Sequence, residues 1–396
     1  EVTKVAISGP LTQVYAIPLV GDLMVGVSNY IAEDISLYLP DYISELPELG
    51  QLYGGKGEMD LEALLAADPD VVIDVGDTKD GIAEDMDSLT EQTGIPFVHI
   101  DATVETAPEA YRMLGELTGK TEKAEELASW CEDTYAMMTA MMEKVDADGA
   151  RKSVLYCLGD KGLNVIAKGS YHAETVNLMT NNLADLPEVV SSGLGNEVDM
   201  EQLLVWNPDV IIFAPDTIYD TVGENATWQQ LDAISSGNYY KTPYGPYGWL
   251  SSPPSVQRYL GMLWLGALLY PDYCEYDLQA EVTEYYELFY QCELTQEMYD
   301  NLMDGAMPEQ RIPLPLRQSA KHRCSVFYKT QQKTAAPCGR RFLYLSAQSL
   351  SSPSYSSSSM PSNSSVSPQF GHSMGPRFRT SSSIVIVFSQ AGQVTS

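Results

Sequence analysis

The sequence lacks most of the patterns that would indicate an enzyme or a site for a bare metal ion. It has four histidines in 396 residues, and its six cysteines include no CxxC pair. Zinc and similar ions need several imidazole or thiolate ligands, so we expect no direct metal ligand, and buried thiols or a disulfide between Cys274 and Cys292 instead. There is no GxSxG elbow or phosphate-binding loop, and no strand directly precedes the glycine-rich residues 54–57 as a dinucleotide fingerprint requires. We therefore expect no intrinsic cofactor.

Long hydrophobic runs are also missing. The longest, residues 259–270, is too short to cross a bilayer as a helix. The chain nevertheless has 44% hydrophobic residues, which over 396 positions is enough for two hydrophobic cores. These proportions predict two globular domains.

Basic residues are scarce in the body of the chain, and acidic residues are absent from its end. Residues 1–309 hold all 54 acidic residues but only 13 of the 23 basic ones. The end is rich in serine, so we expect residues 306–396 to be a basic, Ser-rich, disordered tail. Such a tail can bind membranes or acidic polymers. We favour a change of reading frame near residues 305–311 that replaced the native C-terminus, because the composition changes so abruptly.

What the sequence does contain is a sixteen-residue block that occurs twice. Residues 59–74 read MDLEALLAADPDVVID, and residues 198–213 read VDMEQLLVWNPDVIIF. Each block predicts a short helix followed by a strand. The strand is almost continuously apolar, as in a parallel sheet that is covered on both faces. Two copies of the unit predict two similar α/β lobes.

The ends of each predicted helix carry residues suited to those positions. Asp60 and Asp199 precede the helices, where a short carboxylate accepts hydrogen bonds from the free N–H groups of the first turn. Pro69 and Pro208 follow the helices, and a proline stops a helix because it has no N–H to donate. We therefore expect capped helices that begin after the aspartates.

The rest of the body alternates between strand and helix patterns. The first lobe, residues 1–120, has predicted elements at 2–7, 24–27, 59–75, 96–100 and 107–117. Residues 121–147 contain neither glycine nor proline and, with Thr121 as the N-cap, predict one long connecting helix. The second lobe, residues 148–305, has predicted elements at 153–157, 171–179, 198–214, 253–269, 280–291 and 295–303.

In this order the segments resemble a known family. The series VAISGP, VGVSNY, GGKGEMDLEALLAADPDVVID, PFVHIDAT, the long helix, VLYCLG, VDMEQLLVWNPDVIIF and YGWLSSPPSVQRYLGMLWL is similar to that of the substrate-binding proteins of ABC importers for ferric siderophores, haem and corrinoids, the class III periplasmic binding proteins. The resemblance covers about residues 2–304. It implies an α/β fold of two Rossmann-like lobes with mainly parallel sheets, joined by one long α-helix in a chelatase-like, bilobed arrangement.

The resemblance also implies what such a protein does. Members of the family are not enzymes. They capture a ligand in the cleft between the lobes, outside the cytoplasm, as periplasmic proteins or as cell-surface lipoproteins, here anchored upstream of Glu1. The stiff helix implies a small opening motion. We expect a monomer that binds no nucleic acid, associates with the membrane through its anchor, and delivers its ligand to an ABC permease dimer.

The family docks on its permease through one exposed glutamate from each lobe, and the matching positions are Glu62 and Glu201. Taken alone, a glutamate in the first turn of a helix is explained by its favourable interaction with the helix dipole, worth a few tenths of a kcal/mol. The recurrence of the glutamate at equivalent sites in both repeats favours the docking role.

Ligand-binding residues are expected in the loops beyond the carboxyl ends of the strands, where doubly wound sheets place their ligands. The most informative loop, residues 243–254, reads PYGPYGWLSSPP. It brings Tyr247 and Trp249 close to Ser252, which we expect to cap a helix that begins at Pro253. A helix N-terminus beside aromatic faces suits a bulky, partly anionic chelate, and Trp249 is the strongest single candidate. The other aromatic candidates in cleft loops are Tyr30, Tyr53 and Tyr171.

Basic side chains in the predicted cleft loops also suggest an anionic ligand. The candidates are Lys79, Lys161 and Arg258, and pairing with nearby acids is the other explanation. His172 lies in a predicted cleft loop and is a further candidate. His99 lies inside a strand and is expected to be a buried structural residue.

Three functions remain open from the sequence. The leading hypothesis is a binding protein for an iron chelate of the siderophore kind or for a corrinoid. A protein of the same family that binds an oxyanion, molybdate or tungstate, is the alternative, because Ser251 and Ser252 stand where many similar proteins carry a charged pair. The third is a chelatase-like enzyme that uses His172 with Glu174 or Asp160 as acid and base.

Overall fold

The computed structural model describes residues 2–28, 35–53 and 58–308. The predicted tail therefore lies outside the described residues from position 309 onward. Its predicted start at residue 306 is wrong, because Ala306 is fully buried and its carbonyl accepts a hydrogen bond from the Trp264 indole at 2.8 Å. The Gly305 carbonyl accepts another from the Lys241 backbone N–H at 2.8 Å. The folded body extends past both residues.

The first lobe is a parallel sheet with helices on its faces. Its elements are β1 (Val5–Ile7), α1 (Pro10–Val20), the 3-10 helix η1 (Gly21–Leu23), α2 (Ile35–Tyr38), α3 (Asp41–Ser44), α4 (Leu61–Ala67), β2 (Val71–Gly76), α5 (Ile82–Thr93), β3 (Phe97–Asp101) and α6 (Ala107–Thr118). The strands of the described residues run parallel in the order β1-β2-β3. The central strand β2 is buried along its whole length, which explains its apolar sequence.

The strand predicted at residues 24–27 is not formed. Met24 makes a single bridge to Val5, and Val27 makes another to Glu48. The segment therefore leaves strand β1 after Met24 and pairs with Glu48 at Val27. A change of partner within three residues leaves no continuous ladder of hydrogen bonds.

The repeated block has the predicted caps in both lobes. The Asp60 carboxylate accepts hydrogen bonds from the N–H groups of Glu62 and Ala63 at 3.0 and 2.9 Å, at the start of α4. The Asp199 carboxylate accepts one from the Gln202 N–H at 2.8 Å, at the start of α9 (Met200–Trp206). Both N-caps are confirmed, and each ties the first turn of its helix to the preceding chain.

Helices α4 and α9 each end two residues before the proline that follows them. Asp68 and Asn207 adopt the left-handed conformation, with φ of 52° and 37°, and close the last turns of α4 and α9. Pro69 and Pro208 follow directly and prevent the helices from continuing.

The second lobe has a mixed sheet whose centre is parallel. Its other elements are β4 (Ser153–Leu158), β5 (Asn164–Val165), η2 (Tyr171–Ala173), α8 (Glu174–Met179), β6 (Asn181–Asn182), β7 (Asn196–Glu197), β8 (Val210–Phe213), α10 (Tyr219–Val222), η3 (Trp228–Gln230), α11 (Asp232–Ser235) and β9 (Tyr239–Lys241). The strand order is β7-β5-β4-β8-β9, and β6 pairs with β4. Strands β4, β6, β8 and β9 pair in parallel, whereas β5 is antiparallel to β4 and β7. The predicted class, two α/β lobes with mainly parallel sheets, is confirmed.

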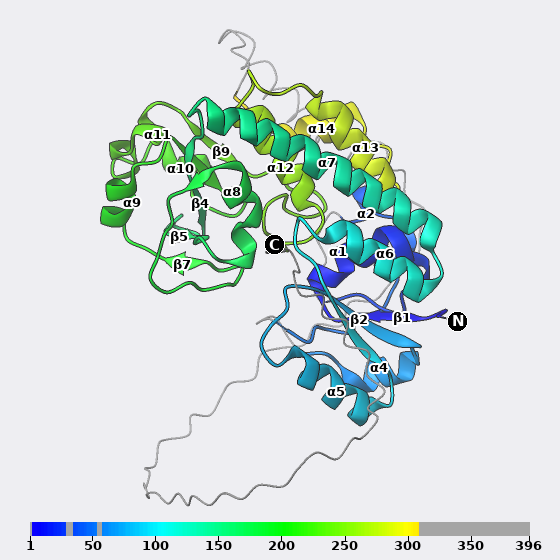
Figure 1. The fold of residues 1–396 in the computed structure, drawn as a ribbon. Helices are drawn as coiled ribbons and strands as arrows, with labels where there is room; N and C mark the ends of the chain where they lie inside the picture. Colours follow the sequence, from blue (N-terminus) through cyan, green and yellow to red (C-terminus); the bar gives the residue numbers. More distant parts are fainter. Residues whose placement is uncertain (1, 29–34, 54–57, 309–396) are drawn as a thin grey trace, which may run out of the picture. The chain divides into compact units, whose positions relative to one another are not determined.

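The long helix is also confirmed. α7 (Thr121–Ala147) begins at Thr121, and the residue in the N-cap position is Lys120, which corrects the expected cap. Figure 1 shows α7 running past both lobes, with α6 packed along it. Its buried side chains recur every three or four residues, as on one face of an amphipathic helix. They include Ala124, Leu127, Cys131, Thr134, Met138, Met141 and Val145.

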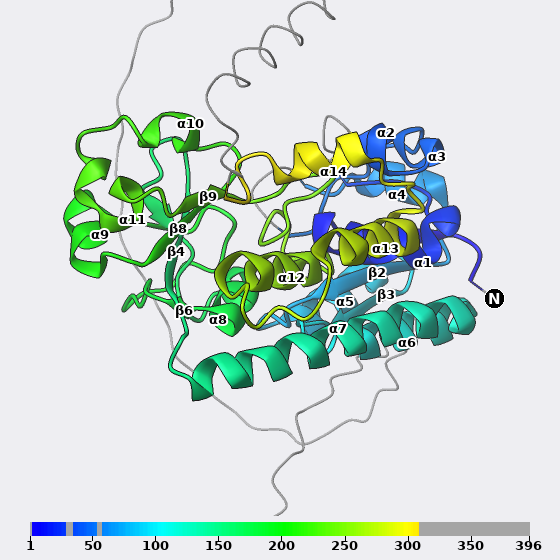
Figure 2. The same ribbon diagram turned by 90° about the horizontal axis from the view of Figure 1, so that it is seen from above.

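The last helices return to the first lobe. These are α12 (Arg258–Leu269), α13 (Leu278–Tyr290) and α14 (Gln296–Met303). Helix α13 lies beside α1 (Figure 2), and the rings of Tyr286 and Phe289 lie 5.6 and 6.1 Å from those of Tyr38 and Tyr111. The assignment of α13 to the second lobe is therefore wrong. One hydrophobic core continues from β1 and β2 through α7, α12 and α13 to β4 and β8, so the lobes share packed side chains as well as a helix.

Candidate functional site

A cleft of about 600 Å³ lies between the two lobes. The first lobe contributes residues 8–11, where β1 leads into α1, and residues 74–77 at the end of β2. The second lobe contributes residues 171–172, 191–194 and 251–254. On the first-lobe side the cleft therefore lies beyond the carboxyl ends of the parallel strands β1 and β2, the position expected for ligands in doubly wound sheets.

Buried polar groups hold the first-lobe wall together. Asp74, inside β2, accepts a hydrogen bond from the Ser8 hydroxyl, and its Oδ2 lies 2.7 Å from Nδ1 of His99. Nε2 of His99 lies 3.1 Å from the Thr78 hydroxyl. Asp74 and His99 are 9% and 5% exposed, so His99 is the buried structural residue predicted from the sequence.

Residues 8–13, which follow β1, are mostly helix. α1 begins at Pro10, a position that tolerates proline because the first N–H groups of a helix have no partner within it. The N-terminus of α1 opens into the cleft, where Gly9, Pro10 and Leu11 form part of the wall. Gln13 is buried in the protein, and its side-chain amide donates to the Tyr247 hydroxyl at 2.9 Å.

Lys79 is the only basic residue among the described residues that line the cleft. Its ammonium group lies 4.6 Å from the centre of the Tyr53 ring, in a cation–π contact. The Tyr53 hydroxyl donates to Asp85 at 3.3 Å. Burial raises the pKa of Tyr53, and the charges of Asp74 and Asp85 raise it further, so Tyr53 lines the cleft as a neutral phenol.

His172 and Tyr171 form part of the opposite wall. Burial lowers the pKa of His172 to about 4; the charges of Arg258 and Lys79 add to this, while the Ser251 backbone and Asp77 oppose it. The imidazole is therefore neutral at pH 7. Its Nδ1 atom is buried and has no hydrogen-bond partner among the described residues. The imidazole lines the cleft, whereas its Nδ1 atom is covered by the surrounding protein.

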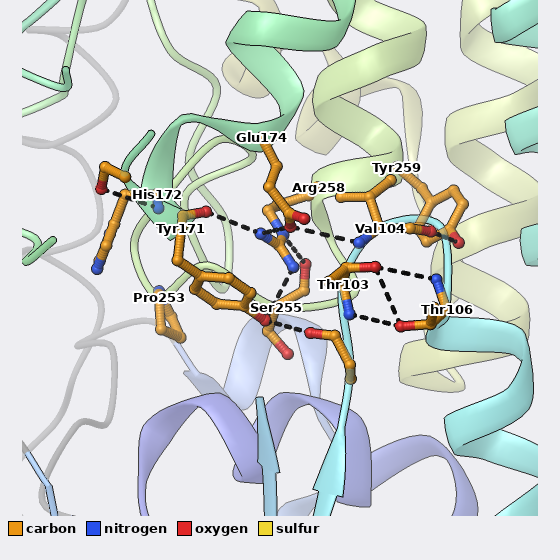
Figure 3. Close-up of polar contacts among 12 residues, drawn as sticks. Thr103, Val104, Thr106, Tyr171, His172, Glu174, Pro253, Ser255, Arg258 and Tyr259 are labelled. Atoms are coloured by element: carbon orange, nitrogen blue, oxygen red, sulfur yellow. Dashed lines mark hydrogen bonds and ion pairs between the residues drawn. The ribbon is translucent and has the colours of Figure 1, made fainter. Parts of the chain in front are cut away.

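Arg258 holds two second-lobe residues, Tyr171 and Glu174, that bond to the first lobe next to the cleft (Figure 3). Its guanidinium is fully buried, forms an ion pair with Glu174, and donates to the hydroxyl and the carbonyl of Tyr171 at 3.0 and 3.2 Å. The Tyr171 hydroxyl donates to the Ala102 carbonyl of the first lobe. The Val104 N–H, also of the first lobe, donates to Glu174 at 3.3 Å. Tyr171 thus contacts both the cleft and the connection between the lobes.

Arg258 is not a cleft residue, and its prediction as a ligand contact is wrong in this structure. Burial by itself would lower the pKa of Arg258, but Tyr171 and Glu174 reverse this and raise it, so the guanidinium stays charged. Burial raises the pKa of Glu174 although Arg258 opposes the shift. The donors of Arg258 are directed at protein groups, so its role is structural.

The acid–base pair considered for a chelatase-like enzyme is not assembled. The Glu174 carboxylate binds Arg258 and the Val104 N–H, and no hydrogen bond joins it to His172 in the described residues. Asp160 is exposed and does not line the cleft. No group of three or more His, Cys, Asp or Glu side chains gathers as a metal site in the part of the chain that the structure describes.

The aromatic loop at residues 243–254 is oriented differently from the prediction. Trp249 and Tyr247 are 0% exposed and belong to the main hydrophobic core, so the expectation that they contact the ligand is wrong. Large aromatic side chains contribute most to a core, and here they fill the space where the lobes meet α12 and α13. Tyr244 is the exposed aromatic residue of the loop, and it lines a side pocket of the cleft.

The helix predicted to begin at Pro253 begins at Arg258. Pro253 is followed by Pro254, and the residue before a proline is disfavoured in the α conformation. Ser252 therefore does not cap a helix, and the anion site expected there is not formed. Ser252 still lines the cleft.

A side pocket of about 320 Å³ continues the cleft into the second lobe. It shares Gly193, Leu194 and Ser252 with the cleft, and its other walls include Asp216 and Tyr244. Residues 191–194 carry no sequence signal for ligand binding beyond the typical turn pattern Ser-Ser-Gly-Leu-Gly at 191–195.

The remaining candidates are distributed as follows. Tyr53, Lys79, Tyr171, His172 and Ser252 line the cleft together. Lys161 is exposed but lines neither the cleft nor its side pocket. Tyr30 lies outside the described residues.

Glu62 and Glu201 are exposed in the first turns of α4 and α9. Figures 1 and 2 show both helices on the parts of their lobes that are remote from α7. Cys274 and Cys292 are free thiols, so the possible disulfide is not formed. Within the described residues, no helix combines the length and the apolar character needed to cross a membrane.

Comparisons with known proteins agree with this architecture. Residues 13–244 match the profile of the family described as Periplasmic binding protein. No curated protein matches the chain. It is similar to the solved structure of an ABC transporter solute binding protein from Sulfurospirillum deleyianum, with 29% identity and a TM-score of 0.70, over 77% of this chain and 94% of that one. It is also similar to a periplasmic solute binding protein from Veillonella parvula, with 25% identity and a TM-score of 0.61, over 77% and 93% of the two chains. The fold is shared with the molybdate periplasmic binding protein MolA of Haemophilus influenzae, at 19% identity and a TM-score of 0.60, over 74% and 94%.

Proposed function

The chain belongs to the periplasmic binding protein family, and we propose that it captures an iron chelate of the siderophore kind or a corrinoid in the cleft between its lobes and hands it to an ABC permease. The coarser part of this description, a solute-binding protein of ABC transporters that acts outside the cytoplasm, follows from the family and from the similar solute binding proteins. The ligand class and the handover are the proposal.

The main support for the proposed ligand class is the size and lining of the cleft. A volume of about 600 Å³ exceeds the needs of a bare ion and is typical of sites for small organic molecules. Apolar groups of Leu11, Val75 and Pro254 and the rings of Tyr53 and Tyr171 all line it. Such walls suit the organic part of a chelate, while the hydroxyl groups and His172 offer a few directed hydrogen bonds.

One observation favours an oxyanion such as molybdate or tungstate as the second candidate. The N-terminus of α1 opens into the cleft at Gly9 and Leu11, and no side chain caps it. Free N–H groups at the start of a helix bind anions. The nearby Asp74 and Asp77 carboxylates act against an anion at this position, so the chelate is the preferred ligand.

Handover to the permease is proposed to use Glu62 and Glu201. The two carboxylates are exposed at equivalent places on two duplicated helices, so they suit a partner built from two like subunits, such as a permease dimer with an arginine on each half.

Thermal unfolding in the presence of candidate ligands tests the proposal. Ferric siderophores, haem, cobalamin, molybdate and tungstate are each added to the purified chain. A ligand present at a hundred times its Kd stabilises the folded state by about 2.7 kcal/mol, which gives a clear rise in Tm. Tyr171→Ala should reduce the rise, whereas Lys161→Ala, outside the cleft, should leave it unchanged. The absence of stabilisation by all of these compounds would contradict the proposal.

A further inference from the structure

The charged groups of the cleft are mainly acidic. Asp74 and Asp77 line it on the first-lobe side, and Asp216 lines the side pocket. Lys79 is the one basic group that the described lining contains, and its ammonium is held over the Tyr53 ring. His172 is neutral at pH 7, for the reasons given above. The walls therefore favour positive over negative charge in a bound molecule.

Asp77 differs from Asp74 because it has no hydrogen-bond or ion-pair partner among the described residues. Asp74 is engaged by the Ser8 hydroxyl and by His99. Asp77 is half-buried at the end of β2 and makes no hydrogen bond or ion pair with the described residues. A carboxylate that loses water without gaining a partner is unfavourable, and a positive or hydrogen-bond-donating ligand removes this penalty.

The carboxylate of Asp77 acts on groups of the opposite lobe. Burial raises the pKa of Tyr171 and lowers that of His172; the Asp77 charge adds to the first shift and opposes the second. All three residues line the cleft. The buried and unpartnered Nδ1 atom of His172 lies in the same wall. A molecule in the cleft thus meets a carboxylate from one lobe and a neutral imidazole from the other.

The field of the whole molecule has the same sign. The chain carries a formal net charge of −31, and its acidic residues are confined to the body. An anionic ligand would approach against this field and would need a cluster of basic side chains at the site. The described walls offer Lys79 alone, since Arg258 is buried and paired with Glu174.

We propose that the cleft selects chelates or corrinoids of neutral or positive net charge, and that Asp77, which lines the cleft on the first-lobe side as His172 does on the second, is the residue that sets this preference. The inference rests on the proposed function and narrows its ligand class. The ligand is expected to place a positive charge or a hydrogen-bond donor at the Asp77 carboxylate. Anionic catecholate chelates and molybdate are expected to be poor ligands.

A set of probes that differ in charge tests the inference by thermal shift and calorimetry. The iron probes are cationic ferrioxamine B, neutral ferrichrome and anionic ferric enterobactin; the corrinoid probes are cationic aquocobalamin and neutral cyanocobalamin. Molybdate serves as the small anion. We expect binding of at least one cationic or neutral probe and none of the anionic ones. Asp77→Asn, which keeps the shape of the side chain, should weaken a cationic probe about tenfold and a neutral probe less.

Asp80→Asn is the matched control, because Asp80 is an exposed acid three residues along that does not line the cleft. It should leave both affinities unchanged. Binding of an anionic probe at least as tight as that of the cationic probes would overturn the inference while leaving the proposed function intact. An equal effect of Asp77→Asn on cationic and neutral probes would also overturn it. Failure of every probe, whatever its charge, would count against the proposed function itself.

Discussion

At the scale of single residues, Arg258 is a side chain whose chemistry suggests a ligand contact but whose surroundings make it structural. We expect Arg258→Met to lower the free energy of unfolding by about 3–5 kcal/mol, because it leaves the partly buried Glu174 carboxylate without its partner. Urea unfolding measures the loss. Arg112→Met is the control: Arg112 pairs with the more exposed Glu125 and Glu132, and its loss should cost less than about 1 kcal/mol. Equal costs would contradict the structural role.

His172 should make the stability of the protein depend on pH. Its pKa is lowered to about 4 in the folded state, chiefly by burial, against about 6.5 in an unfolded chain. Between pH 4 and pH 6.5 the unfolded chain binds more protons than the folded protein does. The contribution of neutral His172 to the free energy of unfolding is therefore fully present above pH 6.5 and is lost as the pH falls toward 4. We expect the difference in unfolding free energy between the native protein and His172→Gln to shrink by about 2–3 kcal/mol from pH 7 to pH 4. Parallel curves for the two proteins would contradict the burial of a neutral imidazole.

Cleft residues were predictable from the sequence where their position in a loop was enough to place them in the cleft. Tyr53, Lys79 and His172 line the cleft because they follow strands or lie in turns, which local patterns reveal. Trp249 lies in an equally suitable loop but is buried, because α13 returns to cover the region. That return depends on contacts between distant parts of the chain, and no local pattern contains them. Asp77 lies two residues before Lys79, but only the structure shows that it makes no hydrogen bond or ion pair with the described residues.

At the scale of elements, the N-caps of the two duplicated helices should contribute equally to stability. Asp60→Ala and Asp199→Ala each remove the acceptor for N–H groups of a first turn, so each should lower the free energy of unfolding by about 1 kcal/mol. Urea midpoints measure both changes. Asp133→Ala, in the exposed middle of α7, is the control and should cost much less. A loss no larger than that of the control would show that these caps are dispensable.

Elements were predictable where the sequence contains both a period and an end signal. The helices α6, α7 and α14 and the repeated helix–strand units have clear caps or glycines, and they match the expectations within a few residues. The strand expected at residues 24–27 has the composition of a strand, but Val27 changes partner to Glu48 and the ladder stops. The start of α12 moved to Arg258 because two consecutive prolines exclude the α conformation before it.

At the scale of the whole body, two lobes and their connecting helix were foreseen, but the shared core was not. The lobes were expected to be joined by α7 alone. The structure adds α12 and α13, which carry buried side chains into a core common to β1, β4 and β8. A packed core has little compressibility, so the opening of the cleft should be even smaller than one helix implies.

With a small opening motion, the surface offered to the proposed permease partner stays nearly constant, and Glu62 and Glu201 lie on it at equivalent positions of the two repeated helices. If Glu62 and Glu201 dock the chain on a permease as proposed, the double change Glu62→Lys and Glu201→Lys should lower uptake of a bound chelate by more than tenfold, because each lysine would repel the arginine proposed to face it. The affinity for the chelate itself should stay the same, since α4 and α9 do not line the cleft. Uptake by cells and calorimetry on the purified protein separate the two effects.

Glu91→Lys, a change at an exposed position on α5, is the control and should leave uptake unchanged. Undiminished uptake by the double variant would exclude these glutamates from docking, and a loss of affinity would move their role to the ligand.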